Sequence, residues 1–125
     1  MARILAIDDD ERILSVYRRL LSSDHEVTLA VGGQAAMDLL AEDDKYDLIL
    51  CDVMMPCASG VEVYEHLQRV HPGLEHRLVF ISGGWAQNHE PFMASVPNLK
   101  VPKPFDPAKL FSAIHTVLSR TPMPG

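Results

Sequence analysis

Short apolar runs that end in polar residues recur along this chain, and segments with helical spacing lie between them. Four such runs stand out, and they cover residues 4–9, 48–52, 78–82 and 99–104. Parallel strands that are buried on both faces have near-continuous apolar sequences, so these runs predict strands of one parallel sheet. The polar residues that end them should lie together on the carboxyl edge of the sheet, where open α/β sheets bind their ligands.

The segments between the runs carry apolar residues at every third or fourth position, which predicts helices. We expect helices over 11–22, 33–41 and 61–70, a short helix starting near residue 90, a last helix opened by Asp106 and Pro107, and a further strand over 25–31. Five strands that alternate with five helices predict a doubly wound α/β fold with a five-stranded parallel sheet. Pro102 has no N–H for a strand ladder, so the last strand should lie at an edge.

The helical spacing also predicts which side chains face the core. The expected faces are Ile13, Val16, Tyr17, Leu20 and Leu21 in the first helix, Val61, Tyr64, Leu67 and Val70 in the third, and Leu110, Phe111, Ile114, Val117 and Leu118 in the last. Asp106 is typical of a helix N-cap, and Pro107 is typical of a first helical turn.

The composition limits the classes of protein to which the chain can belong. Its 125 residues, 47% of them hydrophobic, suffice for one core, so we expect a single domain over 1–120 and a tail or linker remnant over 121–125. The net charge of -6 and the lack of a basic cluster argue against direct binding of nucleic acid. No apolar stretch reaches the roughly 20 residues of a membrane helix, and no secretion pattern opens the chain, which predicts a cytoplasmic protein.

The cysteines and histidines do not suggest a disulfide or a metal site of their own. Cys51 and Cys57 lack a secretory context, so we expect both thiols to be free. Strand alternation turns Cys51 away from the face of Asp52 and into the core. The six histidines lack the spacing of metal ligands, and we expect them at the surface.

An uninterrupted acidic stretch follows the first run. Asp8 and Asp9 are succeeded by Asp10 and Glu11. Such a cluster of negative charge repels itself unless a cation binds, and Mg²⁺ prefers carboxylates and water as ligands. The same residues are also typical of the start of a helix, so on their own they leave both interpretations open.

Asp52, Ser82 and Lys103 lie at the ends of the other three runs. A carboxylate such as Asp52 can act as a nucleophile that forms an acyl phosphate once a metal neutralises the incoming phosphoryl group. Lys103 would add a cation, and Ser82 a hydroxyl donor, for the phosphoryl oxygens. A surface lysine or a serine at a strand end is common by itself, whereas the joint placement at four strand ends indicates one site.

This ordered set of motifs resembles the receiver domains of two-component response regulators, over residues 3–120. The motifs are Asp8-Asp9-Asp10-Glu11, Asp52-Val-Met-Met-Pro56 followed by Gly60, Ser82-Gly-Gly84, and Lys103-Pro-Phe105. The resemblance implies a flavodoxin-like (βα)5 arrangement with strand order 2-1-3-4-5. It also implies that Asp52 is the phosphoacceptor and that Ser82 and Lys103 hold phosphoryl oxygens. The implied Mg²⁺ ligands are Asp8, Asp9, Asp52 and the backbone carbonyl of Met54, with Asp9 as the direct ligand of the acidic pair.

The resemblance further implies the partners. A receiver domain accepts its phosphoryl group from a histidine kinase or its phosphotransfer domain and then changes its contacts with a downstream effector domain or protein. The chain would thus be a signalling domain and not an enzyme, apart from self-catalysed phosphorylation and dephosphorylation. A homodimer through the last helices is also compatible with it.

Two positions depart from the pattern of the family. Lys100 stands where most relatives have an aromatic residue that rotates inward, and a charged side chain there should point to solvent. Pro102 should stiffen the strand end. With the short, proline-containing fourth helix, these features resemble receivers fused to hybrid sensor histidine kinases.

Two other functions stay open at this point. A phosphatase of the haloacid dehalogenase type also uses an aspartate at a strand end with Mg²⁺, but it needs a second aspartate two residues later, where this chain has Met54. A pseudo-receiver that acts as a constitutive interaction module would lack part of the acidic set, which is complete here.

Overall fold

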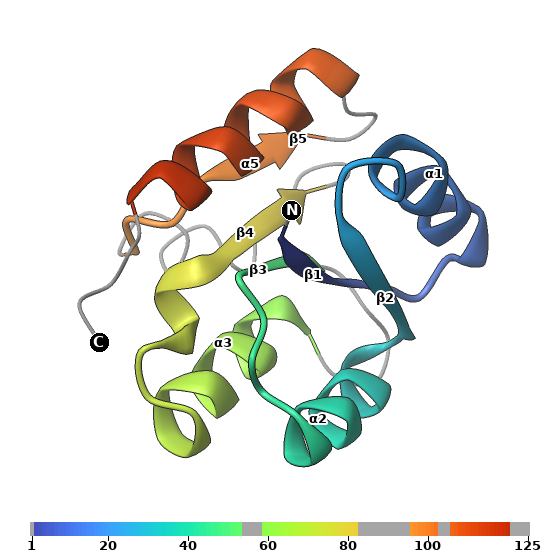
Figure 1. Cartoon of the computed structure of the whole chain (residues 1–125). Coiled ribbons are helices and arrows are strands. Elements are labelled where there is room, and N and C mark those ends of the chain that lie inside the picture. Colours follow the sequence, from blue (N-terminus) through green and yellow to red (C-terminus); the bar gives the residue numbers. More distant parts are fainter. Residues whose placement is uncertain (1, 54–58, 83–95, 103–105, 121–125) are drawn as a thin grey trace.

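The chain alternates between strands and helices. The computed structural model describes residues 2–53, 59–82, 96–102 and 106–120. The elements in Figure 1 are β1 (Arg3–Asp8), α1 (Glu11–Leu21), β2 (Glu26–Val31), α2 (Gly33–Glu42), β3 (Leu48–Asp52), α3 (Gly60–Val70), the 3₁₀ helix η1 (Leu74–Arg77), β4 (Leu78–Ser82), β5 (Lys100–Pro102) and α5 (Pro107–Arg120). The short helix expected near residue 90 and the tail over 121–125 lie outside the described residues.

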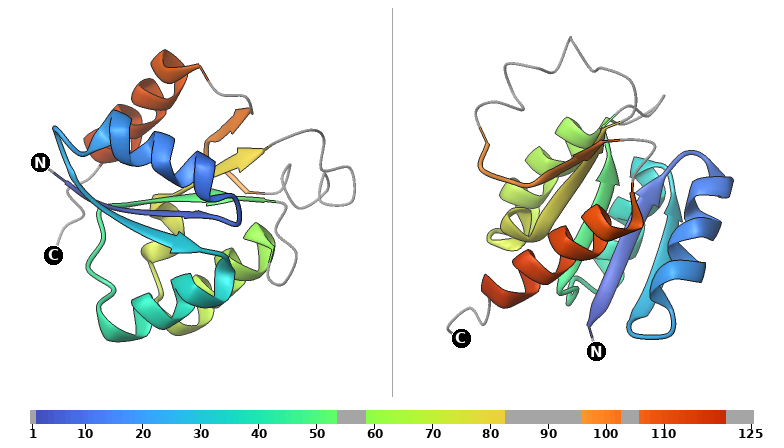
Figure 2. Two further views of the ribbon diagram at one scale, coloured as in Figure 1. Left: turned by 90° about the vertical axis from the view of Figure 1, so that its right-hand side faces the viewer. Right: turned by 90° about the horizontal axis from the view of Figure 1, so that it is seen from above.

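The strands form one parallel sheet in the order β2-β1-β3-β4-β5. Helices α1 and α5 cover one face of the sheet, and α2 and α3 cover the other (Figure 1, Figure 2). The doubly wound α/β fold with strand order 2-1-3-4-5 is therefore confirmed. Among the described strands β5 pairs with β4 alone, so it forms an edge, as Pro102 predicts.

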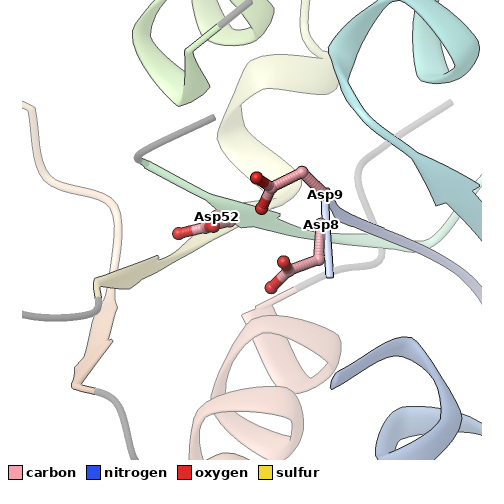
Figure 3. Close-up of side chains that lie close together, drawn as sticks. All are labelled: Asp8, Asp9 and Asp52. Atoms are coloured by element: carbon pink, nitrogen blue, oxygen red, sulfur yellow. The ribbon is translucent and has the colours of Figure 1, made fainter. Parts of the chain in front are cut away.

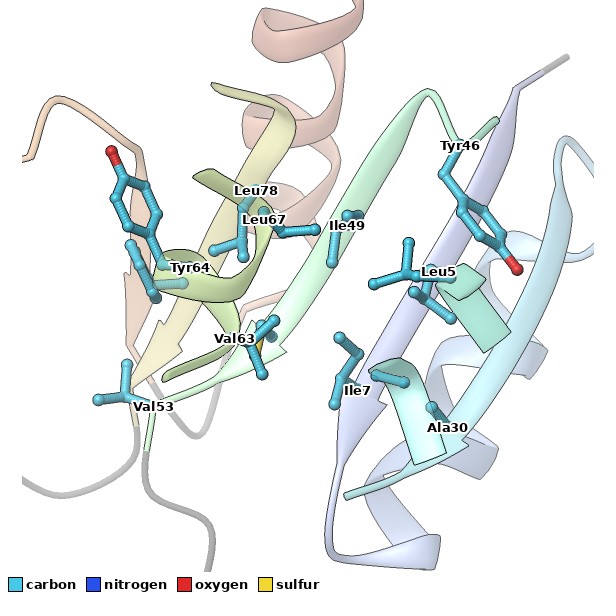
Figure 4. Close-up of a cluster of buried hydrophobic side chains, with 14 residues drawn as sticks. Leu5, Ile7, Ala30, Tyr46, Ile49, Val53, Val63, Tyr64, Leu67 and Leu78 are labelled. Atoms are coloured by element: carbon cyan, nitrogen blue, oxygen red, sulfur yellow. The ribbon is translucent and has the colours of Figure 1, made fainter. Parts of the chain in front are cut away.

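Alternation along the central strands divides the core into two layers. Strand β3 is buried from end to end, in agreement with its unbroken apolar run. Ile49 and Cys51 belong to the layer covered by α2 and α3, which Figure 4 shows. Leu48 and Leu50 belong to the layer covered by α1 and α5. Both faces of the sheet are thus covered, which leaves its carboxyl edge for polar side chains.

Side-chain caps begin three of the helices. Asp10 before α1, Ser59 before α3 and Asp106 before α5 each accept a hydrogen bond from a backbone N–H two or three residues later, at 2.9, 3.2 and 2.9 Å. Each cap satisfies an N–H that has no partner within its helix. The predicted cap at Asp106 is confirmed.

The buried helix faces differ in part from the expected ones. Leu14 is fully buried in α1, whereas Ile13 is only half-buried. Phe111 of α5 is 45% exposed while Ala113 is buried, and Val70 of α3 is 49% exposed. Successive residues of a helix lie about 100° apart around its axis. A run of adjacent apolar residues therefore covers a wider arc of the helix than the face that packs on the sheet.

No helix in the described part of the chain combines the length and apolarity that crossing a membrane requires.

Lys100 lies at the surface, as expected for a charged residue at the start of β5. Its Nζ donates a hydrogen bond to the carbonyl oxygen of Val96 at 2.9 Å. Partial burial lowers its pKa. The side chain is therefore bound to the segment that leads into β5.

Gly60 brings the first turn of α3 against the end of β3. A Cβ on this residue would lie 2.8 Å from the carbonyl oxygen of Asp52 and 2.9 Å from the Cα of Val53. The N–H of Gly60 also donates to the carbonyl oxygen of Val53 at 2.9 Å. The close approach of α3 therefore requires glycine here.

Gly60→Ala should lower the free energy of unfolding by about 1–3 kcal/mol, because the backbone at the end of β3 has to shift, although alanine favours helices. Urea denaturation measures this difference. Glu65→Ala, at an exposed position of the same helix, is the control and should change the value by less than about 0.5 kcal/mol. A Gly60→Ala variant as stable as the wild type would contradict the account of this contact.

Candidate functional site

Three carboxylates meet at the carboxyl edge of the sheet. Asp8 is the last residue of β1, Asp9 follows it, and Asp52 is the last residue of β3. The two strands are neighbours with Ile7 paired to Cys51, so Asp8 and Asp52 occupy the next position on adjacent strands. Each acid offers a carboxylate oxygen, and these oxygens lie within 4.8 Å of one another (Figure 3).

The three acids differ in exposure. Asp8 is fully buried, Asp52 is 3% exposed and Asp9 is exposed. The Oδ1 of Asp8 accepts a hydrogen bond from the N–H of Asp10 at 2.9 Å. Asp9 thus faces the solvent from which a hydrated ion would arrive, whereas Asp8 and Asp52 form the floor of the site.

This donor set fits a divalent cation. Carboxylates so close together repel one another, and burial removes the water that would solvate their charges. A cation would offset both effects, and Mg²⁺ prefers oxygen ligands while keeping several of its waters. Among the described residues, no other group of three or more His, Cys, Asp or Glu side chains lies as close together.

The backbone fixes the ends of the two central strands. The N–H of Gly32 donates to the carbonyl oxygen of Asp8 at 3.1 Å, with a φ of +93° that favours glycine. The N–H of Val53 donates to the carbonyl oxygen of Ile81 at 3.1 Å, which continues the ladder beyond Asp52. The two buried acids are therefore held by strands that are paired up to and beyond them.

Tyr17 of α1 lies near the site, and the sequence pattern did not predict this nearness. Helical spacing predicts only that it faces the core, and it is fully buried. Burial raises the pKa of its phenol strongly, and the charges of Asp8 and Asp52 raise that pKa further. A tyrosine among aliphatic core positions is the signal that could have identified it.

Cys51 points away from the acids, as predicted. It is fully buried in the layer covered by α2 and α3 and forms no disulfide. Its Sγ donates to the carbonyl oxygen of Asp52 at 3.4 Å, and burial raises the pKa of the thiol. The thiol therefore stays protonated and unreactive at neutral pH. Cys57 lies outside the described residues.

The side chains of three further predicted site residues lie outside the part of the chain that the structure describes. Met54 and Lys103 lie outside the described residues. Ser82 ends β4, one residue after Ile81, which pairs with Asp52, but the structure does not describe its side chain. The backbone of Ser82 thus ends at the same edge as the acids, and the roles of these three residues stay predictions.

Three of the described histidines, His25, His66 and His71, are only partly exposed, which departs from the expected surface position. The side chain of His71 at the end of α3 is 10% exposed, and its Nδ1 lies 2.9 Å from the Oδ2 of Asp44. This contact joins the end of α3 to the loop before β3, at the amino end of the sheet. The carboxylate cluster itself contains no histidine.

Comparison with known sequences identifies related proteins. A family model described as "Response regulator receiver domain" matches residues 4–115. The transcriptional regulatory protein CpxR of Escherichia coli K12 is 31% identical over 122 residues, which cover 97% of this chain and 51% of CpxR. The response regulator MprA of Mycobacterium leprae is 32% identical over 120 residues, which cover 95% of this chain and 52% of MprA. The chain thus spans about half the length of these relatives.

Solved structures share the fold. A response regulator receiver domain protein from Clostridium thermocellum has a TM-score of 0.83 at 26% identity, with 96% of each chain covered. The chemotaxis protein CheY4 of Vibrio cholerae has a TM-score of 0.80 at 24% identity, with 94% of this chain and 99% of CheY4 covered. The likeness to CheY4 concerns the fold alone.

Asp9→Asn should weaken Mg²⁺ binding by more than about tenfold, since even outer-shell partners of a metal contribute that much. Asp8→Asn should cost less, because Asp8 is buried and one of its oxygens is engaged with the N–H of Asp10. Calorimetric titration of metal-free protein with Mg²⁺ measures both losses. Asp24→Asn, at an exposed position, is the control and should bind as the wild type does. Equal losses for the two site variants would refute the assignment of Asp9.

Proposed function

This chain belongs to the response regulator receiver domain family, and we propose that it accepts a phosphoryl group on Asp52 in a Mg²⁺-dependent two-component phosphorelay. The observation that carries this proposal is the convergence of the Asp8, Asp9 and Asp52 carboxylates within 4.8 Å. Their place at the carboxyl edge of a doubly wound sheet supports it, because ligands of such sheets bind there.

The acids and one carbonyl group would hold the cation. Asp9 would bind it directly from the solvent side, with Asp8 and Asp52 beneath and the backbone carbonyl of Met54 completing the share of the protein. Bound Mg²⁺ supplies positive charge that screens the incoming phosphoryl group from the carboxylates. The mixture of buried and exposed acids supports this arrangement, since Mg²⁺ keeps part of its water shell.

The proposed reaction transfers a phosphoryl group from a phosphorylated histidine. A carboxylate oxygen of Asp52 attacks the phosphorus, the phosphorus–nitrogen bond breaks, and the imidazole keeps the electron pair and takes up a proton. Lys103 and Ser82 hold the phosphoryl oxygens through a positive charge and a hydroxyl. The strand position of Asp52 supports its role as nucleophile, because β3, which Asp52 ends, is paired with β1 on one side and with β4 on the other.

The proposed partners follow from this reaction. A histidine kinase or its phosphotransfer domain donates the phosphoryl group, and an effector domain or protein detects the change, with a homodimer through the last helices as a further assembly. CpxR is named a transcriptional regulatory protein, and its matched region is about half of its length, which supports an output in a separate domain. The chain itself then acts as a signalling domain, with self-catalysed gain and loss of the phosphoryl group and no direct contact with nucleic acid.

The proposed output differs from the aromatic relay of most receivers. The exposed position of Lys100 and its bond to Val96 support a signal that travels through the backbone around Gly83 and Gly84. With Pro102, this departure also supports an origin in a hybrid sensor kinase. The proposed unit is a cytoplasmic domain over 1–120 followed by a tail over 121–125.

The two alternative functions receive no support from the family comparison. A phosphatase of the haloacid dehalogenase type would need an aspartate where Met54 stands. A pseudo-receiver would lack part of the acidic set, whereas Asp8, Asp9 and Asp52 lie together here.

Incubation with acetyl phosphate and Mg²⁺ should add the mass of one phosphoryl group to the wild type and leave Asp52→Asn unmodified. Asp24→Asn keeps the site and serves as the control, which should be modified like the wild type. Intact-protein mass spectrometry measures the added mass. Beryllofluoride with Mg²⁺ should alter the spectra of the wild type and of Asp24→Asn, and it should leave the spectra of Asp52→Asn unchanged. A wild type that stays unmodified and spectrally unchanged under both conditions would rule out the phosphoacceptor function.

A further inference from the structure

The two edge strands of the sheet differ in how they are protected. Among the described strands, β2 pairs with β1 alone and β5 pairs with β4 alone. The N–H of Phe80 donates to the carbonyl oxygen of Leu99, so the residues of β5 that direct their backbone groups outward are Lys100 and Pro102. A lysine and a proline on an edge oppose the addition of another strand. The edge at β5 is therefore protected.

The edge at β2 offers free backbone groups. The N–H groups of Glu26 and Gly32 donate to carbonyl oxygens of β1 and its neighbouring residue. Backbone groups alternate in direction along a strand, so Val27, Leu29 and Val31 direct their N–H and C=O groups away from β1. No strand in the described part of the chain pairs with this side of β2. The left view of Figure 2 looks onto this edge, which lies open between α1 and α2.

The segment that forms this edge is apolar. Residues 27–31 include no charged residue, proline or glycine, and Val31 is 52% exposed. The one charge of β2 is Glu26 at its start, whose carboxylate lies 3.7 Å from the guanidinium of Arg3. The pairing with β1 runs without a bulge along the whole strand. Charges, prolines and bulges are the usual protection of an edge, so their absence from 27–31 indicates a surface that another strand covers.

A groove beside the edge has a charge pattern that is complementary to itself. Its lining consists of Glu11, Leu14, Ser15, Arg18, Leu29 and Val31. The exposed residues of α1 in this lining are spaced four and three positions apart, so they form one stripe along the helix. The stripe has an acid, Glu11, at one end and a base, Arg18, at the other. A second stripe that runs in the opposite direction would bring each acid toward a base.

A second copy of β2 in antiparallel orientation would satisfy the edge of both copies. When Leu29 faces Leu29 of the other copy, Val27 faces Val31 in both directions, because antiparallel strands advance in opposite senses. These are the residues that direct their backbone groups outward, so each outward N–H finds a carbonyl acceptor. Glu26 then faces Gly32, and no like charges oppose each other.

We propose that the outer edge of β2 is a self-association surface, on which a second copy of this chain pairs its own β2 in an antiparallel register centred on Leu29. The two sheets become one continuous sheet. Because α1 packs over β2 and β1, the two α1 helices then run antiparallel on the same face, with their Glu11 and Arg18 stripes toward each other. The two acidic sites lie at opposite ends of the joined sheet and stay open. The inference is independent of the proposed function and of a homodimer through the last helices.

Disulfide formation tests the register. In a Cys57→Ser background, Leu29→Cys should give a linked dimer on oxidation, because facing Cα atoms of antiparallel strands lie about 4.5–5.5 Å apart, within disulfide range. The double variant Val27→Cys/Val31→Cys should also link, whereas each single change should not, because its thiol faces a valine. Cys51 is buried and can stay. Gel electrophoresis without reductant measures the linked fraction. Single variants that link as well as the double variant would overturn the register.

Sedimentation equilibrium of the unphosphorylated chain tests the association. The wild type should show a reversible equilibrium between monomer and dimer. Val31→Lys should weaken dimerisation by about tenfold or more, because it places a charge on the edge. Arg18→Glu should weaken it as well, and Glu11→Lys added to Arg18→Glu should restore it. Phe111→Lys, at a position of α5 that is 45% exposed, is the matched control and should dimerise like the wild type.

Three results would overturn the proposal. The first is a wild type that stays monomeric, and capture of an extended peptide of another protein at this edge would then assign the edge to that partner. The second is a dimer that Val31→Lys leaves intact, and the third is a dimer that only Phe111→Lys disrupts. If Leu29→Cys does not fold, the double cysteine variant supplies the test of register.

Failure of this inference can be told from failure of the proposed function. Val31 lies outside the acidic site, so Val31→Lys should gain the mass of a phosphoryl group from acetyl phosphate and Mg²⁺ as the wild type does. A chain that dimerises through β2 without becoming phosphorylated would refute the proposed function alone. A chain that becomes phosphorylated and stays monomeric would refute this inference alone.

Discussion

The pairing of the central strands β1 and β3 is the constraint on which the site depends, because it brings three carboxylates together at the carboxyl edge of the sheet. Asp8 and Asp52 are almost wholly buried there, and Asp9 lies beside them. A flexible loop would relax by moving such charges apart. Here the acids end paired central strands, and α3 approaches closely through Gly60, so the fold holds the mutually repelling charges together. The fold thus keeps together the carboxylate cluster to which the proposed function assigns the cation.

Because helices cover both faces of the sheet, adjacent residues of one strand face different surroundings. Alternation directs Cys51 into one core layer, where burial keeps its thiol protonated, while Asp52 follows it on the other face. The same alternation places Asp8 and Asp52 above the layer that contains Tyr17. A shift of one residue in the pairing of β1 with β3 would exchange these roles, so the register of the central strands is itself part of the site.

The sequence predicted the sheet and its acidic cluster because both depend on strand ends. In a chain that alternates strands and helices, an unbroken apolar run such as 48–51 predicts a strand that is buried on both faces. The residue that ends this strand then lies at the carboxyl edge of the sheet. The helix faces were less predictable, since spacing gives the period but not the rotation of the helix. Leu14 and Phe111 therefore differ from expectation. The contact of His71 with Asp44 and the nearness of Tyr17 to the acids depend on elements distant in sequence, which no local pattern encodes.

The central claim is that Asp52 becomes an acyl phosphate in a site that requires the cation. Borohydride reduces an acyl phosphate to an alcohol, so a phosphorylated aspartate is converted to homoserine and can be located by peptide mass spectrometry. After treatment with a phosphoryl donor and Mg²⁺, the account predicts homoserine at position 52 alone, and none when a chelator removes the metal. Homoserine at another acidic position, or equal conversion of Asp52 in the presence of the chelator, would contradict it.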